Sequence, residues 1–340
     1  MHTLINRANP YLALIGLGWF VPILRIFAGD NLNQQLRELW QQLGVPVLAI
    51  ALFIGLWAQT AARIDTSLGG IPGPAAVWQE AKNLVADHRA ERERRDEFYE
   101  RQRVRNEQAL AEDSAAPVRV RQYTGKPTYL DQILTSLATV FTGFVLATLV
   151  AVPLGVVAGL SKTINAAINP LVQIFKPVSP LAWLPIVTMV VSAVYVSAEP
   201  VFEKSFVNSA ITVTLCSLWP ALINTALGVS SIDKDLMNVG RVLRLGWFTQ
   251  VFKIVLPSAL PLIFTGLRLS LGVGWMVLIA AEMLAQNPGL GKFVWDEFQN
   301  GSSSSLAKIL VAVFTIGLIG FLLDRVMLAV QAAFTYSAGR

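Results

Sequence analysis

Charged side chains inside long apolar stretches are the residues of this chain whose position could do chemistry. Arg268 and Glu282 lie in one such stretch, and Asp324 and Arg325 lie in another. A charge at the centre of a bilayer costs about 2.5–3.5 kcal/mol on insertion scales, so each of these residues is a functional candidate. Arg268 and Glu282 share nearly one helical face but stand about 21 Å apart, so they cannot pair directly. We expect Arg268 to be anchored by a neighbouring helix or to meet a passing ion, and Glu282 to bond backbone or a partner helix. Asp324 and Arg325 should find partners on different sides of their helix.

Covalent catalysis has little support in the sequence. The chain has two histidines, His2 and His88, and a single cysteine, Cys216, which excludes a disulfide framework or a thiolate metal cluster. The phosphate-binding sequence Gly-x4-Gly-Lys-Ser/Thr is absent as well. Any nucleotide-derived energy must therefore come from another chain.

Composition places the chain among membrane proteins, with 54% hydrophobic residues, 14% charged residues and a mean hydropathy of +0.54. A membrane-spanning helix needs about 20 apolar residues. The candidate spans are residues 46–62, 133–160, 167–195, 206–229, 258–284 and 305–333. We predict an all-α, polytopic membrane protein with about six transmembrane helices. Residues 1–45 should form an N-terminal segment with a helix along the membrane surface, although residues 10–28 could instead be a seventh span.

The basic residues of the short loops predict the orientation of the spans. One side of the predicted membrane collects Lys162, Lys234, Arg241, Arg244 and Lys253, whereas the other has Lys204 and Lys292. This places a loop at residues 230–257 in the cytoplasm. The net charge of +5 is explained by such anchoring residues and requires no nucleic acid.

Residues 63–129 form the one long segment that is plainly not membrane-spanning. Its charges are mixed in sign, and Glu91–Arg95 or Glu97–Arg101 has the i,i+4 spacing that supports an exposed helix. The topology places this insertion in the periplasm. A solvated helix is the main prediction, and a contact surface for a periplasmic binding protein is the alternative.

The polar stretch between the fourth and fifth predicted spans resembles the cytoplasmic coupling loop of type I ABC importer permeases. That pattern is Glu-Ala-Ala, three residues, Gly, nine residues, Ile, one residue and Leu-Pro. The matching residues at its end are Ile254, Leu256 and Pro257. At its front, Asn238, Val239 and Gly240 stand for Glu-Ala-Ala, and Arg244 stands for the glycine, with Gly246 two residues later. We expect an amphipathic helix here and a sharp helix stop at Leu256-Pro257.

Sequence blocks between residues 130 and 333 are similar to the permeases of nitrate, bicarbonate and cyanate importers, in a group that also handles sulfonates and taurine. These blocks include WPALINTALGV, from Trp219, and IFTGLRLSLGVGWMVLIAAEML, from Ile263. The resemblance implies a five-helix permease core at residues 130–335 and a multi-pass protein of the bacterial inner membrane, most similar to the nitrate subgroup.

The same resemblance implies the partners. These are a second permease copy, cytoplasmic ATPase subunits that bind ATP and Mg²⁺, and a periplasmic or lipid-anchored substrate-binding protein. Bicarbonate, cyanate, sulfonate or taurine are alternative substrates. An ion-coupled secondary transporter is the alternative class, but it would need midplane charges and repeated halves, and neither is evident.

Neutral polar residues suit the passage of a small anion, because hydroxyl and amide donors bind it without trapping it. The candidates for the translocation path are Ser179, Trp219, Asn224, Thr225 and Thr265, together with Arg268 and Glu282. Hydrogen bonding between packed helices is the alternative role for these neutral residues. Pro220 should loosen the helix beside Asn224 and Thr225.

Overall fold

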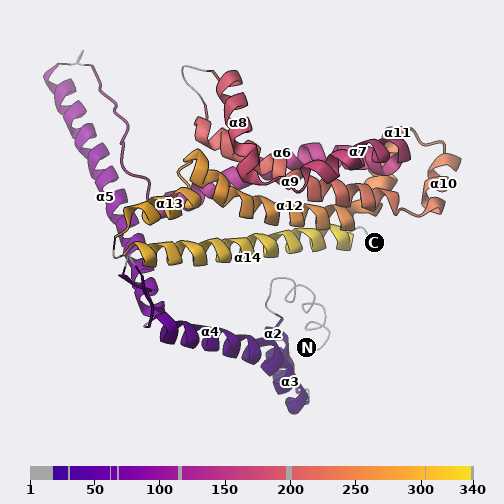
Figure 1. The fold of residues 1–340 in the computed structure, drawn as a ribbon, viewed down its shortest axis with the longest axis horizontal. Coiled ribbons are helices and arrows are strands. Elements are labelled where there is room, and N and C mark those ends of the chain that lie inside the picture. The colour runs from indigo at the N-terminus through magenta and orange to yellow at the C-terminus, as the bar shows by residue number, and fades with distance from the viewer. Residues whose placement is uncertain are drawn as a thin grey trace.

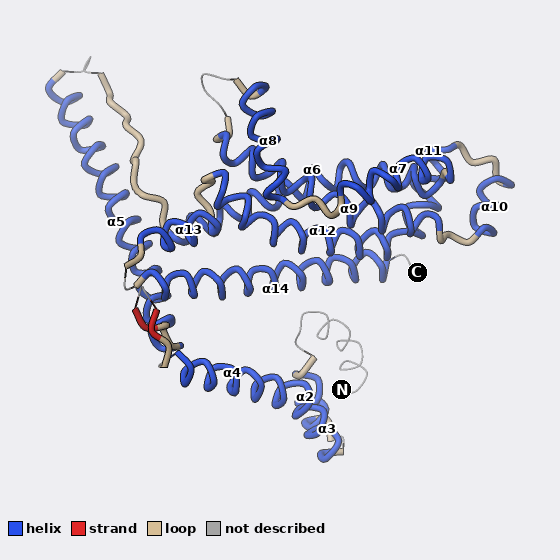
Figure 2. The backbone as a smooth tube through the Cα atoms, viewed as in Figure 1, coloured by secondary structure: helices blue, strands red, loops and turns tan. Residues whose placement is uncertain are grey.

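The computed structural model describes residues 18–29, 31–61, 63–66, 69–113, 117–196, 201–302 and 304–337. Within these ranges the fold is helical except for loops and one two-residue antiparallel pair, β1 (Asp65–Thr66) with β2 (Gly69–Gly70) (Figure 2). The all-α prediction is therefore confirmed. Of the predicted surface segment, residues 1–17 lie outside the described part, and α2 (Phe20–Phe27) and α3 (Leu32–Leu39) follow them.

In the described part of the chain, five continuous helices are long and apolar enough to cross a membrane. They are Leu32–Ala61, Tyr129–Leu160, Lys204–Ser230, Trp247–Ala285 and Ser305–Phe334. A sixth span is possible if α7 (Lys162–Phe175) and α8 (Pro180–Val194), which meet at 103°, cross together. These helices agree with the prediction of about six spans.

The span predicted over residues 167–195 begins earlier, at Lys162, and is broken after Phe175. Ser179 has extended backbone angles, φ −64° and ψ 141°, and caps α8. A residue that precedes proline is disfavoured in the helical region, and Pro180 follows Ser179. The break therefore has a local cause, whereas its angle depends on packing.

A central helix, α9 (Lys204–Ser230), packs between α6 (Tyr129–Leu160) and α12 (Leu256–Ala285), and α14 (Ser305–Ser337) packs on α12 (Figure 1). Glycines on α6 bring its backbone close to α9. Added Cβ atoms at Gly143, Gly155 and Gly159 would lie 2.8, 2.9 and 2.7 Å from backbone carbonyl oxygens of α9. Small residues permit close helix contact in membranes, where packing replaces the hydrophobic drive.

The first long apolar helix stands apart from this bundle in Figure 1. It comprises α3, the π-helical turn η1 (Trp40–Gly44) and α4 (Val45–Ala61), and many of its large apolar side chains are exposed. Trp57 contacts the ring of Phe314 in α14 at a centroid distance of 5.3 Å. An exposed apolar helix of this kind is suited to lipid.

The charged insertion folds as a single helix, α5 (Pro74–Glu112), followed by an extended return segment. Side chains of α5 fasten that segment through its backbone: Arg121 N donates to Gln102 Oε1 at 2.7 Å, and Asn106 Nδ2 donates to Arg119 O at 3.0 Å. The predicted exposed helix is therefore confirmed. What the sequence did not predict is that this helix carries an extended segment along its side.

Of the two ion pairs predicted within α5, one forms. Glu97 and Arg101 approach to 3.7 Å, as predicted. Glu91 and Arg95 have the same spacing, but Glu91 accepts instead from Arg94 at 3.1 Å and from the Tyr123 hydroxyl at 2.8 Å. That hydrogen bond to Glu91 raises the pKa of Tyr123. The carboxylate of Glu91 thus binds Arg94 and the return segment instead of Arg95.

The two ends of the bundle differ as the predicted topology requires. In Figure 1, α10 (Lys234–Val242) and α11 (Trp247–Gln250) lie at one end, whereas α5 and α13 (Leu290–Asn300) lie at the other. The predicted cytoplasmic loop and the predicted periplasmic insertion are therefore on opposite sides of the apolar spans.

Cysteine labelling tests the orientation itself. Gln108→Cys, in exposed α5, is expected to react with a membrane-impermeant thiol reagent in intact spheroplasts, and Val242→Cys in α10 is expected to react only after permeabilisation. The native Cys216 is buried, so its background should be low. The reverse labelling pattern would overturn the orientation.

Candidate coupling surface and translocation residues

The loop that resembles a coupling loop is built from α10, a turn and a long helix. After α10, the chain turns at residues 243–246 and enters α11, the π-helical turn η2 (Val251–Val255) and α12 without interruption. The predicted helix stop at Leu256-Pro257 is therefore wrong. Pro257 lies inside this helix just after η2, where the π turn shifts the hydrogen bonds so that Leu256 N donates to Val251 O.

Gly240 closes α10 onto the start of this long helix. It is buried, and an added Cβ would lie 3.1 Å from Ile254 Cδ1 and 3.4 Å from the Gln250 side chain. Gln250 Nε2 in turn contacts Met237 Sδ at 3.8 Å. Gly240 and Ile254, two residues of the resembling pattern, thus meet inside the loop and hold its shape. The remaining front residues, Asn238 and Val239, are exposed.

Arg244 occupies the place where the resembling pattern has glycine, and its backbone explains that preference. Its φ is +48°, in the left-handed region that glycine adopts without strain. Gly246 does not take over this role, since its φ is −62° and an added Cβ would meet nothing within 4 Å. The chain therefore keeps the turn of the pattern with a strained arginine.

Arg244→Gly is expected to stabilise this turn by about 1 kcal/mol, because a non-glycine residue in the left-handed region costs about that much. Thermal unfolding of the purified protein would measure the effect. Gly246→Ala is the matched control and is expected to leave the unfolding temperature unchanged. A less stable Arg244→Gly variant would show that the arginine side chain makes a stabilising contact that outweighs the strain.

The outer face of the loop is apolar and exposed. Among the apolar side chains of the loop, Val242 has the largest exposed fraction, 81%. The other members of this surface, which we call the coupling surface, are Leu236, Val239, Leu243, Trp247, Phe248 and Phe252. Exposed apolar patches of this kind mark protein or membrane contacts. Leu236, Val239, Leu243 and Trp247 follow from the helical spacing, whereas the exposure of Val242 and Phe248 was not predicted.

The charged residues of the spans are paired as separate structural units. Arg268 in α12 binds Asp324 in α14 through two hydrogen bonds, one of them from Nη2 to Oδ2 at 2.8 Å. Arg325 instead stacks over the ring of Phe321 at 5.0 Å. The prediction of a neighbouring-helix anchor for Arg268, and of different partners for Asp324 and Arg325, is confirmed. A pathway role for Arg268 stays a prediction.

Glu282 lies fully buried where α12, α6 and α13 meet. It accepts from Ser136 Oγ at 2.8 and 2.9 Å and from Gly291 N at 3.0 Å, and Leu290 N donates to the same serine at 2.8 Å. The expectation that backbone and a partner helix satisfy Glu282 is confirmed. Sequence reasoning missed Ser136, although a serine in an apolar span is a signal of such a partner.

The neutral candidates do not converge in the monomer. Ser179 caps α8, and Thr265 Oγ1 donates to Pro261 O at 2.8 Å. Asn224 Nδ2 donates to Pro220 O at 2.8 Å, and its Cβ adjoins Gly266 of α12. Thr225 is fully buried against Gly155 of α6. These contacts are of the helix-packing kind, and the role of the residues in transport stays a prediction.

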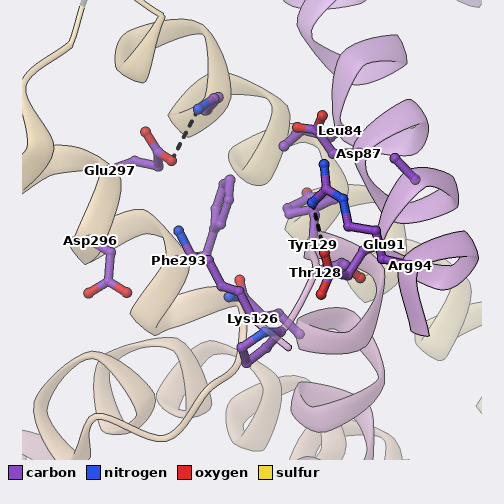
Figure 3. A pocket seen from close by; sticks show the side chains of 14 residues that line it. Leu84, Asp87, Glu91, Arg94, Lys126, Thr128, Tyr129, Phe293, Asp296 and Glu297 are labelled. Atoms are coloured by element: carbon purple, nitrogen blue, oxygen red, sulfur yellow. Dashed lines mark hydrogen bonds and ion pairs between the residues drawn. The ribbon is translucent and has the colours of Figure 1, made fainter. Parts of the chain in front are cut away.

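A cavity of about 230 Å³ opens at the foot of α5, on the side of the insertion (Figure 3). Gln132 Oε1 is buried in its lining without a hydrogen-bond partner among the described residues. Its charged lining comprises four carboxylates, Asp87, Glu91, Asp296 and Glu297, and three cations, Arg94, Lys126 and Lys308. Because carboxylates outnumber cations, this cavity is not an electrostatic match for an anion. Among the described residues, no group of three or more His, Cys, Asp or Glu is placed to hold a metal ion.

Comparison with known proteins shows which family has this architecture. Residues 151–336 match the model of the binding-protein-dependent transport system inner membrane component family. The nitrate import permease protein NrtB of Synechococcus elongatus is 37% identical over 58% of this chain and 66% of that protein. The bicarbonate transport system permease protein CmpB of the same species is 38% identical over 57% of this chain and 65% of that protein.

The matched region thus spans just under two thirds of either relative. A solved chain of the inward-facing MetNI methionine ABC transporter overlaps 61% of this chain and 96% of its own length, with 16% identity and a TM-score of 0.47. The family match covers more than half of the 340 residues and includes α7 to α14. The chain belongs to the binding-protein-dependent transport system inner membrane component family.

Proposed function

We propose that this chain is the membrane-spanning permease subunit of an ATP-driven importer of a small inorganic anion, with nitrate as the favoured substrate. The observation that carries this proposal is the family match over residues 151–336, which contains the coupling loop and the helices around it. The permease would form the path and contain no ATPase site. ATP and Mg²⁺ would be bound by a separate cytoplasmic subunit.

The coupling surface supports the mechanism. Its exposed apolar side chains lie on α10, on the turn after it, on α11 and on η2, and α11 is continuous through η2 with the spanning helix α12. A force applied by two closing ATPase subunits would therefore reach α12 through unbroken helix. In a permease homodimer, this motion would rock the spans between inward and outward openings. A periplasmic or lipid-anchored binding protein would deliver the anion from the other side.

Nitrate is favoured over bicarbonate by the Trp219-Pro220 block and the Ile-Ala-Ala-Glu-Met-Leu block, which resemble the nitrate subgroup. Bicarbonate is the second candidate because CmpB is as similar to this chain as NrtB is. An ion-coupled secondary transporter is not supported by the similarity to ABC permeases.

Uptake by cells with and without this chain tests the proposal. We expect cells that express it with its ATPase and binding protein to accumulate ¹⁵N-nitrate faster than ¹⁴C-bicarbonate. The accumulation should vanish when the partner ATPase carries an inactivated catalytic site, and should survive a protonophore as long as ATP is maintained. Preferred bicarbonate uptake would reassign the substrate, and uptake independent of the ATPase would overturn the mechanism.

A further inference from the structure

The break between α7 and α8 holds three aromatic rings from three helices. Phe175 ends α7, Trp183 lies in the first turn of α8, and Trp219 lies near the middle of α9. The ring centroid of Phe175 is 5.7 Å from that of Trp183 and 6.1 Å from that of Trp219, on which it stacks at 11°. Phe175 therefore keeps the two indole rings within one cluster.

Both indole N–H groups of this cluster lack an acceptor. The Nε1 atoms of Trp183 and Trp219 are buried, and neither has a hydrogen-bond partner among the described residues. A buried tryptophan N–H usually finds a partner, and leaving one unpaired costs about 1–3 kcal/mol. Trp275 shows the ordinary arrangement, since its Nε1 donates to Ile316 O at 3.0 Å. Two unpaired donors in one cluster call for an explanation.

The charges around the cluster favour a negative ligand. The helices α7, α8 and α9 contain no aspartate or glutamate. Lys176 directly follows Phe175, whereas Lys162 and Lys204 begin α7 and α9, about 20 Å along each helix from the rings. The buried carboxylate of Glu282 and the carboxylate of Asp324 lie on other helices and already accept from their own donors. The cluster thus presents two unpaired donors, with one cation, Lys176, next to Phe175 in the sequence and no carboxylate on the three helices that form it.

The position of the cluster suits a site within the membrane. Lys204–Ser230 has 27 residues, and Trp219 is 15 residues from its start, about 22 Å along the helix. In other transporter folds, broken helices near the midplane provide the substrate site. At such a depth an anion needs donors that replace part of its hydration.

We propose that the indole N–H groups of Trp183 and Trp219 contact the transported anion on its path. The inference rests on the proposed anion import and names the residues that would recognise the substrate. A planar oxyanion such as nitrate or bicarbonate has several acceptor oxygens, so it can accept from two donors. Neutral donors replace hydration without the tight binding that an arginine would impose. The three helices that form the cluster contain no carboxylate, and this absence favours anions over cations.

The test removes the two donors and keeps the rings. In the complete importer, Trp183 and Trp219 are each replaced, singly and together, by 3-benzothienylalanine, in which sulfur stands for the indole N–H. We expect nitrate uptake at limiting concentration to fall on the order of tenfold in the double variant, since each lost hydrogen bond is worth a few-fold. Assembly, basal ATPase activity and the thermal unfolding temperature should stay unchanged or rise slightly, because an unsatisfied donor is gone.

The same replacement at Trp275 is the matched control. It removes a donor that has an acceptor, so it is expected to lower the unfolding temperature and leave the nitrate dependence of uptake unchanged. Normal nitrate uptake by the double variant, with an active unmodified importer, would overturn the contact and leave the proposed function intact. A lower unfolding temperature of the double variant would also overturn it, because the N–H groups would then stabilise the fold. An unmodified importer that carries no anion would instead overturn the proposed function.

Discussion

A permease with Val242→Asp is expected to reach the membrane and fold, but to lose its ATPase partner and its uptake activity. Val242 is the most exposed member of the coupling surface, with an exposed fraction of 81%, so the substitution leaves the packing of the monomer unchanged. An interface that covers this position would have to bury an unpaired carboxylate, which is strongly unfavourable. Loss of a central interface contact costs at least about 2 kcal/mol, or roughly thirtyfold in affinity. Co-purification of the ATPase and anion uptake would measure the two effects.

Val120→Asp is the control for this substitution. Val120 lies in the return segment of the insertion, beside α5, and its exposed fraction is 77%. The same chemical change at a similar exposure on the opposite side should leave ATPase binding intact. If the Val242→Asp variant binds the ATPase as the unmodified chain does, the coupling surface has been assigned to the wrong residues.

Gly155→Leu is expected to prevent accumulation of the folded protein. An added Cβ at Gly155 would lie 2.6 Å from Thr225 Cβ and 2.9 Å from Leu222 O, so the clash is with the backbone of α9 as well as with a side chain. Overpacking a well-filled core typically costs about 1–3 kcal/mol, and more where backbone must move. Because α6 and α9 share this seam over much of their length, their separation would disturb the whole bundle. The amount of protein in the membrane and its unfolding temperature in detergent are the measurements.

Gly317→Leu supplies the comparison in α14. No atom other than its own helix backbone lies within 4 Å of an added Cβ there, so its accumulation should match that of the unmodified chain. Equal accumulation of both variants would mean that α6 and α9 do not pack through Gly155. Loss of both would show that leucine is not tolerated at either site, including the one that is open in the monomer.

The sequence by itself determined the features that depend on local composition. Apolar stretches of sufficient length predicted the spans, and mixed charges predicted the exposed helix α5. Both signals work because hydropathy and charge spacing act within a few residues.

Only the tertiary structure decided which distant residues meet. Arg268 binds Asp324 across 56 positions, and Ser136 reaches Glu282 across 146. The continuation of the helix through Pro257 was also missed, because the π turn that accommodates it depends on how α10 packs on Gln250 and Ile254.

The tertiary structure also decided which apolar helices face lipid and which face other helices. Residues of α4 and α9 are similarly suited to a bilayer, yet α4 is exposed and α9 is the centre of the bundle. Hydropathy does not distinguish them, because lipid and the protein interior are both apolar surroundings. For the same reason, the sequence did not predict that the indole N–H groups of Trp183 and Trp219 are unpaired. A tryptophan in an apolar span has a predictable depth, but whether its N–H finds an acceptor depends on the neighbours that the fold provides.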